Sequence, residues 1–82
     1  MKVNAFNMRC FFHLTNSHEV IRDDEGVDVI SVATARRLAL QAVYELQQES
    51  DHAREDWHGW QLDVVDSGGN ILLSIPLDMP AQ

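Results

Sequence analysis

Residues 60–76 read WQLDVVDSGGNILLSIP, and this stretch decides the fold. Apolar and polar residues alternate over Trp60–Val64, which is the period of a half-buried strand. The polar, glycine-rich run Asp66–Asn70 is typical of a tight turn between strands. A second apolar run, Ile71–Ile75, then meets Pro76, which lacks an amide donor and therefore ends a strand or lies at a sheet edge. The stretch predicts an antiparallel hairpin.

A second hairpin is predicted upstream, at residues 8–22. Residues 8–14 alternate with the two-residue period of a strand. Their apolar face comprises Met8, Cys10, Phe12 and Leu14, and their mixed face comprises Arg9, Phe11 and His13. The polar residues 15–17 favour a turn, and residues 19–22 read as a second, short strand. The acidic run at residues 23–25 ends in Gly26, as in a further turn, and residues 27–30 can add a short extended segment.

The period changes after Ser31, which is a good N-cap because its hydroxyl can accept a hydrogen bond from the first helical turn. From Val32 onward, apolar residues recur at three- and four-residue steps, as in an amphipathic helix. These positions are Ala35, Leu38, Ala39, Ala42, Val43 and Leu46. We expect the regular helix to weaken between Glu49 and Asp56, because acidic residues there oppose the negative end of the helix dipole.

The element order is therefore β-β-α-β-β in a single domain, residues 1–82, with frayed ends at residues 1–6 and 77–82. This order predicts a two-layer α+β fold in which one long helix packs on a mainly antiparallel four-stranded sheet. One helix covers only one face of the sheet, so we expect the other face to expose Phe11, Ile21, Val65 and Leu72. An exposed apolar face is typical of a dimer interface.

The charge is strongly acidic and unevenly placed. The 82 residues hold 6 Lys and Arg against 13 Asp and Glu, a net charge of −7. Residues 1–22 hold 3 basic residues and 1 acidic residue, and the remainder holds 3 basic and 12 acidic residues. Nucleic-acid binding depends on clustered basic residues, so direct binding to nucleic acid is not expected. A basic protein partner suits this charge better.

The composition favours a cytoplasmic protein. Cys10 is the single cysteine, so no internal disulfide can form, which favours a reducing compartment. The N-terminus lacks the apolar core of a signal peptide. No run approaches the roughly 18 apolar residues of a membrane span, so we expect no contact with the membrane.

Candidate chemistry is sparse. The carboxylates of residues 23–25 suit a divalent cation, but they lack the alternating spacing of a calcium loop. Four histidines suggest zinc, but Cys10 and His13 would fall on opposite faces of a strand. The histidines are His13, His18, His52 and His58. Cys10 is expected to be a buried structural thiol. We therefore predict no enzyme, no cofactor and no metal ligand, and keep a small metal-binding domain as an alternative.

The predicted function is protein–protein contact, with a homodimer as the first expectation. Trp57 lies in a polar stretch and is expected to be partly exposed, as aromatic interface anchors are. The candidate interaction surface comprises Arg9, Phe11, His13, Ile21, Val65, Leu72 and Trp57.

The chain resembles a family of small uncharacterised bacterial proteins, found largely in soil and plant-associated proteobacteria. Members of that family read R-Y-F-F-H-L and then D-x-E-G, and this chain has RCFFHL at residues 9–14 and DDEG at residues 23–26. An alanine-rich helix and a W-x-[IL]-x-V-x-D-x-x-G-x-[IL]-L-x-[IL]-P ending follow, matched here by residues 60–76 with one residue added at the turn. Cys10 replaces the usual aromatic residue. The resemblance covers nearly the whole chain and implies the same architecture, with unknown function and no catalytic residues.

The chain is also similar, more weakly, to HicB-type antitoxins, which place a strand pair, an acidic D-x-x-G turn and an Ala/Glu-rich helix in this order. That family neutralises a small basic RNA-cleaving toxin, so the similarity implies an inhibitor of a basic partner as the alternative function. The chain departs from the family in its second hairpin, and we see no C-terminal DNA-binding helix or ribbon.

Overall fold

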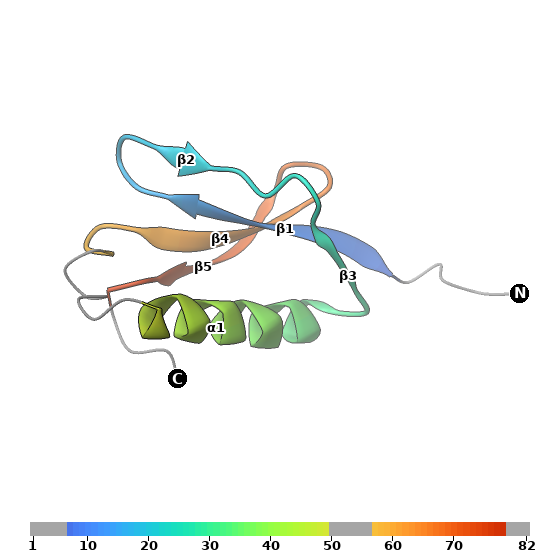
Figure 1. The fold of residues 1–82 in the computed structure, drawn as a ribbon. Coiled ribbons are helices and arrows are strands. Elements are labelled where there is room, and N and C mark those ends of the chain that lie inside the picture. The colour runs from blue at the N-terminus through green and yellow to red at the C-terminus, as the bar shows by residue number, and fades with distance from the viewer. Residues whose placement is uncertain (1–6, 50–56, 79–82) are drawn as a thin grey trace, which may run out of the picture.

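The computed structural model describes residues 7–49 and 57–78 of the chain. In these residues one helix packs on one face of an antiparallel sheet (Figure 1). The elements follow the order β1 (Met8–Thr15), β2 (Val20–Ile21), β3 (Val27–Val29), α1 (Val32–Gln48), β4 (Gln61–Asp66) and β5 (Ile71–Pro76). The predicted α+β fold is confirmed.

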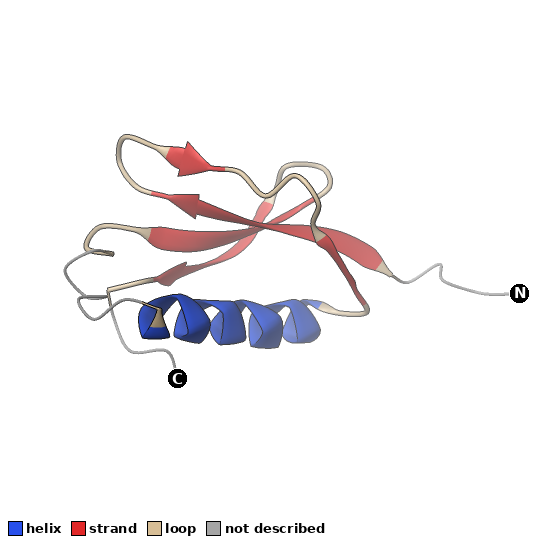
Figure 2. Cartoon of the chain, viewed as in Figure 1, coloured by secondary structure: helices blue, strands red, loops and turns tan. Residues whose placement is uncertain are grey.

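The sheet has five strands, and β1 and β4 lie at its centre. The path β2-β1-β4-β5 crosses the sheet, and β3 pairs with β1 as well (Figure 2). Every pair is antiparallel. The strand β3 is the short extended segment expected within residues 27–30, so it adds a strand to the four that were predicted. Strand β1 is long enough, at 8 residues, to pair with β2 and β3 at different points along its length.

The strand register assigns side chains to two faces. Phe12 lies opposite Val64 and packs against the core, whereas Phe11 lies opposite Val65 on the other face. Directly opposed residues share a face of the sheet. We call the face that α1 covers the inner face and the opposite one the outer face. Cys10 is fully buried on the inner face, so the alternation predicted for β1 is confirmed.

The helix begins as predicted. Ser31 has an extended backbone, with φ of −164°, and its Oγ accepts a hydrogen bond from the Thr34 amide at 3.1 Å. The helix ends at Gln48 with Glu49 as its C-cap, at the N-terminal limit of the predicted window. Residues 50–56 lie outside the described residues. The buried side of α1 is narrow and comprises Ala35, Ala39 and Val43. Nowhere in the described residues is there a helix long and apolar enough to cross a membrane.

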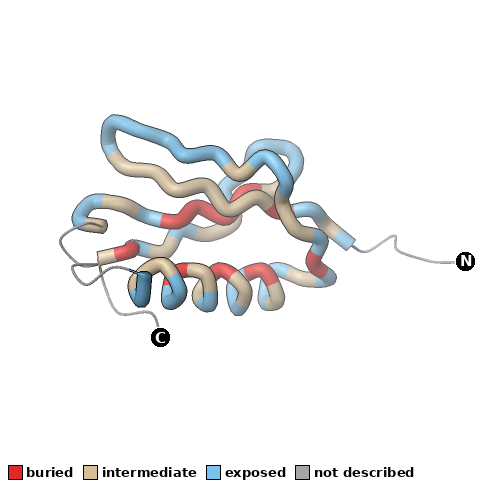
Figure 3. The backbone as a smooth tube through the Cα atoms, viewed as in Figure 1, coloured by how far each residue is buried: buried red, intermediate tan, exposed pale blue. Residues whose placement is uncertain are grey.

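The core lies between α1 and the inner face (Figure 3). Its fully or nearly fully buried residues are Cys10, Val29, Ala35, Ala39, Val43, Leu62, Val64 and Leu77. The prediction of a frayed end is wrong for Leu77, whose amide donates to the Trp60 carbonyl at 3.0 Å and whose carbonyl accepts from Gln47 Nε2 at 3.0 Å. The other residues predicted to be frayed, 1–6 and 79–82, lie outside the described residues.

Candidate interaction surface

Three residues of the predicted surface meet on the outer face. The rings of Phe11 and His13 stack, with centroids 6.3 Å apart and planes 20° apart. Val65 lies opposite Phe11 and is only 8% exposed. Residues two apart on a strand, or directly opposed across a pair, share a face. Phe11, His13 and Val65 therefore form one group, which we call the outer-face cluster.

A polar network lies beside this cluster. Asp63 lies opposite His13 and is 7% exposed. Its carboxylate accepts hydrogen bonds from Ser74 Oγ at 2.6 Å, from Gln61 Nε2 at 2.8 Å and from Thr15 Oγ1 at 3.2 Å. These donors offset the cost of burying a carboxylate. The outer face is therefore partly polar, and not the broad apolar surface that the sequence predicts.

The loop between β2 and β3 is held against β1 by Asp23. One carboxylate oxygen accepts a hydrogen bond from the Phe12 amide, and the other accepts from the amides of Glu25 and Gly26, each at 3.1 Å. Phe12 lies between the part of β1 that pairs with β3 and the part that pairs with β2. Asp23 thus takes the place of a strand partner at this point.

Asp23 also orients the ring of His13. The Asp23 amide donates to His13 Nδ1 at 3.1 Å, which leaves the proton of the neutral ring on Nε2. Burial alone would raise the pKa of the Asp23 carboxyl. The hydrogen bonds from the three amides and the proximity of His13 lower it by more, so the pKa lies below its usual value. The carboxylate is therefore charged at neutral pH, and its charge is used to hold the loop.

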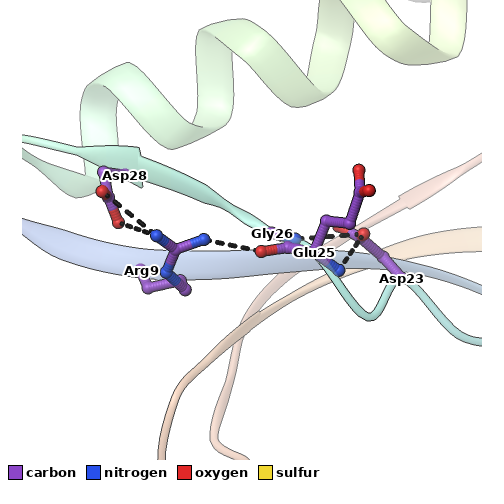
Figure 4. A network of polar contacts seen from close by, with 5 residues as sticks. All are labelled: Arg9, Asp23, Glu25, Gly26 and Asp28. Carbon is purple, nitrogen blue, oxygen red and sulfur yellow. Dashed lines mark hydrogen bonds and ion pairs between the residues drawn. The ribbon is translucent and has the colours of Figure 1, made fainter.

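Arg9 ties the same loop to the start of β1 (Figure 4). Its Nη1 donates to the Glu25 carbonyl at 2.6 Å, and its Nη2 lies 3.2 Å from the carboxylate of Asp28. Gly26 completes the contact, because its φ is +72° and a Cβ there would lie 2.7 Å from the Cys10 carbonyl. We call Arg9, Asp23 and Gly26 the loop anchor. It joins the two segments, residues 9–14 and 23–26, that the sequence resemblance singles out.

A hollow of about 250 Å³ opens on the outer face between loop residues 22–24 and the turn at residues 66–69. The outer-face cluster lines it together with Arg22, Asp23, Asp24 and Asp66. Hydrogen bonds from Asn70, assisted by the Gly68 amide, hold the pKa of the Asp66 carboxyl below its usual value. The rim of the hollow therefore carries charged carboxylates beside two stacked rings.

The loop anchor and the core elements lie within the part of the chain that a protein-family comparison recognises. The model for the domain of unknown function DUF6894 matches residues 9–78. The chain belongs to the DUF6894 family. No curated protein and no solved structure matches the chain. The DUF6894 description gives no activity, in agreement with the unknown function implied by the sequence resemblance, and the similarity to HicB-type antitoxins stays a prediction.

Two predicted surface residues of this DUF6894 domain do not lie on the outer face. Ile21 pairs with Leu14, an inner-face residue, so it lies on the inner side, where it is 52% exposed. The β4–β5 ladder shifts register between Val64 and Val65, and Leu72 packs against the core. A one-residue shift reverses the faces of the side chains that follow, which is why simple alternation misplaced Leu72.

Trp57 also packs toward the core and not onto the outer face. Its ring meets that of Trp60 edge-on, with centroids 5.8 Å apart and planes 89° apart, and both rings pack against the buried cluster. The Nε1 of Trp57 is buried and has no hydrogen-bond partner within residues 7–49 and 57–78. Trp57 is half-buried, and it contributes to the core more than to the surface.

The described residues contain no group of three side chains suited to hold a metal ion. Cys10 lies on the inner face and His13 on the outer face, so this pair cannot chelate one ion. Burial, with Asp66 nearby, raises the pKa of the Cys10 thiol, which keeps it protonated and poorly nucleophilic at neutral pH. His52 lies outside the described residues.

The sequence prediction missed a second candidate surface, on the side of α1. Tyr44 is 56% exposed, and Leu40 is half-buried. These apolar residues fall beside the stripe that faces the core. The sequence could have revealed this surface, because these residues depart from the helical spacing of the core-facing positions. An apolar residue outside the buried side of a helix does not pack into the core and is open to a partner.

Proposed function

We propose that this DUF6894-family chain works by protein–protein contact, as a homodimer, and not by catalysis. The observation that carries the proposal is the set of large apolar side chains that lie outside the core, with Tyr44 at 56% and Ile71 at 62% exposed. A small domain gains stability when such surface is buried against a partner. The apolar side of α1 lies apart from the polar outer face, so it offers a surface for a second copy.

The state of the ionisable side chains supports a non-catalytic role. Asp23 and Asp66 use their carboxylates to hold backbone amides of their own loops, and Asp63 is enclosed by three side-chain donors. Cys10 is buried with a raised pKa. Groups committed in this way are poor acids, bases and nucleophiles.

Light scattering and sedimentation velocity over a wide concentration range test the homodimer. We expect the average mass to rise from one chain toward two chains as concentration increases. A mass of one chain at the highest concentration reached would contradict the proposal.

A basic partner is the second candidate, as for an inhibitor of the antitoxin type. It is favoured by the net charge of −7 and by the carboxylates at the rim of the outer-face hollow. We expect a lysine-rich peptide to bind at low salt and Asp24→Lys to weaken that binding. Glu45→Lys, which makes the same charge change on α1, is the matched control. An equal loss of peptide affinity in both variants would mean that the peptide responds to the net charge of the chain and not to the hollow.

A cytoplasmic location belongs to the same proposal. It is supported by the single buried thiol of Cys10, which suits a reducing compartment. Visualising a tagged full-length chain in cells tests it.

A further inference from the structure

Among residues 7–49 and 57–78, β5 pairs with β4 alone, and we call its other side the free edge. This edge has a definite pattern of backbone groups. In an antiparallel pair, alternate residues direct both N–H and C=O to the same neighbouring strand. The Leu77 amide donates to the Trp60 carbonyl at 3.0 Å, and the register continues through Ile75 and Leu73 without a shift. Leu73 and Ile75 therefore direct both backbone groups to β4, as Leu77 directs its amide. Ser74 directs its N–H and C=O away from β4, to the edge.

The two edges of the sheet differ in how well they are protected. The opposite edge carries β2, of two residues, and β3, of three, with the Asp23 carboxylate between them. Short, interrupted and charged edges resist pairing with another strand. Strand β5 is continuous over six residues and contains no charged side chain. A register shift near its start and Pro76 at its end confine the open part to the residues around Ser74.

One side of α1 lies next to this edge. Gln47 Nε2 donates to the Leu77 carbonyl at 3.0 Å, which places the Gln47 side of the helix over the end of β5. At about 100° per residue, Arg36 and Leu40 lie within roughly 20° of Gln47 around the helix axis, and Tyr44 follows at roughly 60°. We call Arg36, Leu40 and Tyr44 the β5 side of α1. The other side of the helix faces Phe12 and Val27 across a separate groove.

We propose that a second copy of this chain adds its β5 to the free edge of β5, antiparallel and about a two-fold axis at Ser74, so that the two sheets become one. This proposal rests on the homodimer proposed above and names its interface. The Ser74 amide of each copy donates to the Ser74 carbonyl of the other. The axis also brings the β5 sides of the two α1 helices together.

The chemistry of the edge favours a second copy over a different partner. An antiparallel edge centred on one residue is complementary to itself under two-fold symmetry. Arg36 and Tyr44 lie four residues before and after Leu40, so antiparallel helices that meet at Leu40 set each Arg36 guanidinium beside the Tyr44 ring of the other copy, a cation–π pair. Stable interfaces bury about 1,200–2,000 Å², more than a short strand pair supplies, so the helices must take part.

Substitution at Ser74 separates the edge from the rest of the domain. Ser74→Pro removes the outward amide but leaves the β4-facing amides of Leu73 and Ile75 in place. Ser74→Ala removes the hydroxyl that bonds Asp63 and keeps the amide. We expect Ser74→Pro to raise the dimer dissociation constant about ten- to a hundredfold, because two hydrogen bonds are lost, and Ser74→Ala to leave it within about threefold of wild type.

A second pair of variants keeps the test decisive if Ser74→Pro fails to fold, which circular dichroism will show. Leu40→Lys places two like charges at the helix contact, and Gln41→Lys adds the same charge on the other side of α1. We expect the first to abolish the dimer and the second to keep it. A dimer that survives Leu40→Lys and a folded Ser74→Pro overturns the β5 interface and leaves the homodimer standing. A wild-type monomer overturns both.

Discussion

Asp23 is the residue on which the loop between β2 and β3 depends. Its carboxylate accepts from the amides of Phe12, Glu25 and Gly26, which lie in two different parts of the chain. Three acids in a row can be taken for a cation site, but in this fold the first of them is used internally. The acidic run is therefore a structural motif, and the free charge at the hollow comes chiefly from its neighbour Asp24.

We predict that the contribution of Asp23 to stability depends on pH. The folded-state pKa is lowered, so the stabilisation is fully present above the unfolded-state pKa of about 4 and is lost as pH falls through the folded-state value. Asp23→Ala should cost about 1–2 kcal/mol of unfolding free energy at pH 7, as loss of a capping carboxylate does, and progressively less as the pH falls below about 4. Urea unfolding of both proteins across pH measures this.

The exposed neighbour supplies the control. Asp24→Ala should change the unfolding free energy by less than about 0.5 kcal/mol across the same pH range, as surface substitutions usually do. An Asp23→Ala deficit that does not shrink as the pH is lowered from 7 to the acid limit of the fold would show that the charge of the carboxylate is not what holds the loop.

Strand β5 and the residue that follows it show how an element extends beyond its pattern. Pro76 closes the predicted strand, yet Leu77 is fully buried and its amide and carbonyl are both bonded. Asp78 then accepts from the Gly59 amide at 3.4 Å and lies 3.4 Å from His58 Nδ1. The end of β5 thus anchors the loop that precedes β4.

We predict that Leu77→Ala destabilises the fold strongly. Removing a fully buried leucine side chain costs about 2–5 kcal/mol, from lost burial and from the cavity left behind. Ile71→Ala, at the exposed start of the same strand, should cost less than about 1 kcal/mol. Guanidinium unfolding of the two variants compares them. Similar losses would mean that Leu77 is not part of the core in solution.

At the scale of the whole molecule, charge and apolar surface are separated. Residues 1–22 carry a net charge of +2 and the remainder carries −9, and the carboxylates of Asp24 and Asp66 flank the outer-face hollow. The edge of β5 and the β5 side of α1 carry no acidic side chain. A basic partner therefore suits the outer-face hollow, and a second copy suits the β5 edge with the β5 side of α1. The dependence of binding on ionic strength distinguishes the two contacts.

We predict opposite salt dependences for the two proposed contacts. Raising salt from about 0.05 M to 0.5 M shortens the screening length severalfold, which weakens repulsion between two acidic copies and should strengthen the dimer. The same increase in salt should weaken the binding of a lysine-rich peptide to the outer-face hollow. Sedimentation and fluorescence titration across this range measure the two constants. A dimer that weakens with salt would indicate an interface held by ion pairs.

The sequence by itself determined the order of the elements, the helix start at Ser31 and the two faces of β1, because these depend on local period and on capping and turn chemistry. It also placed Phe11, His13 and Val65 on one face. Only the tertiary structure decided the strand order, the face of Leu72 and Ile21, the burial of Asp63 and Leu77, and the use of Asp23. Those features depend on register and on contacts between distant segments, and a shift of one residue in pairing reverses which side chains face the core.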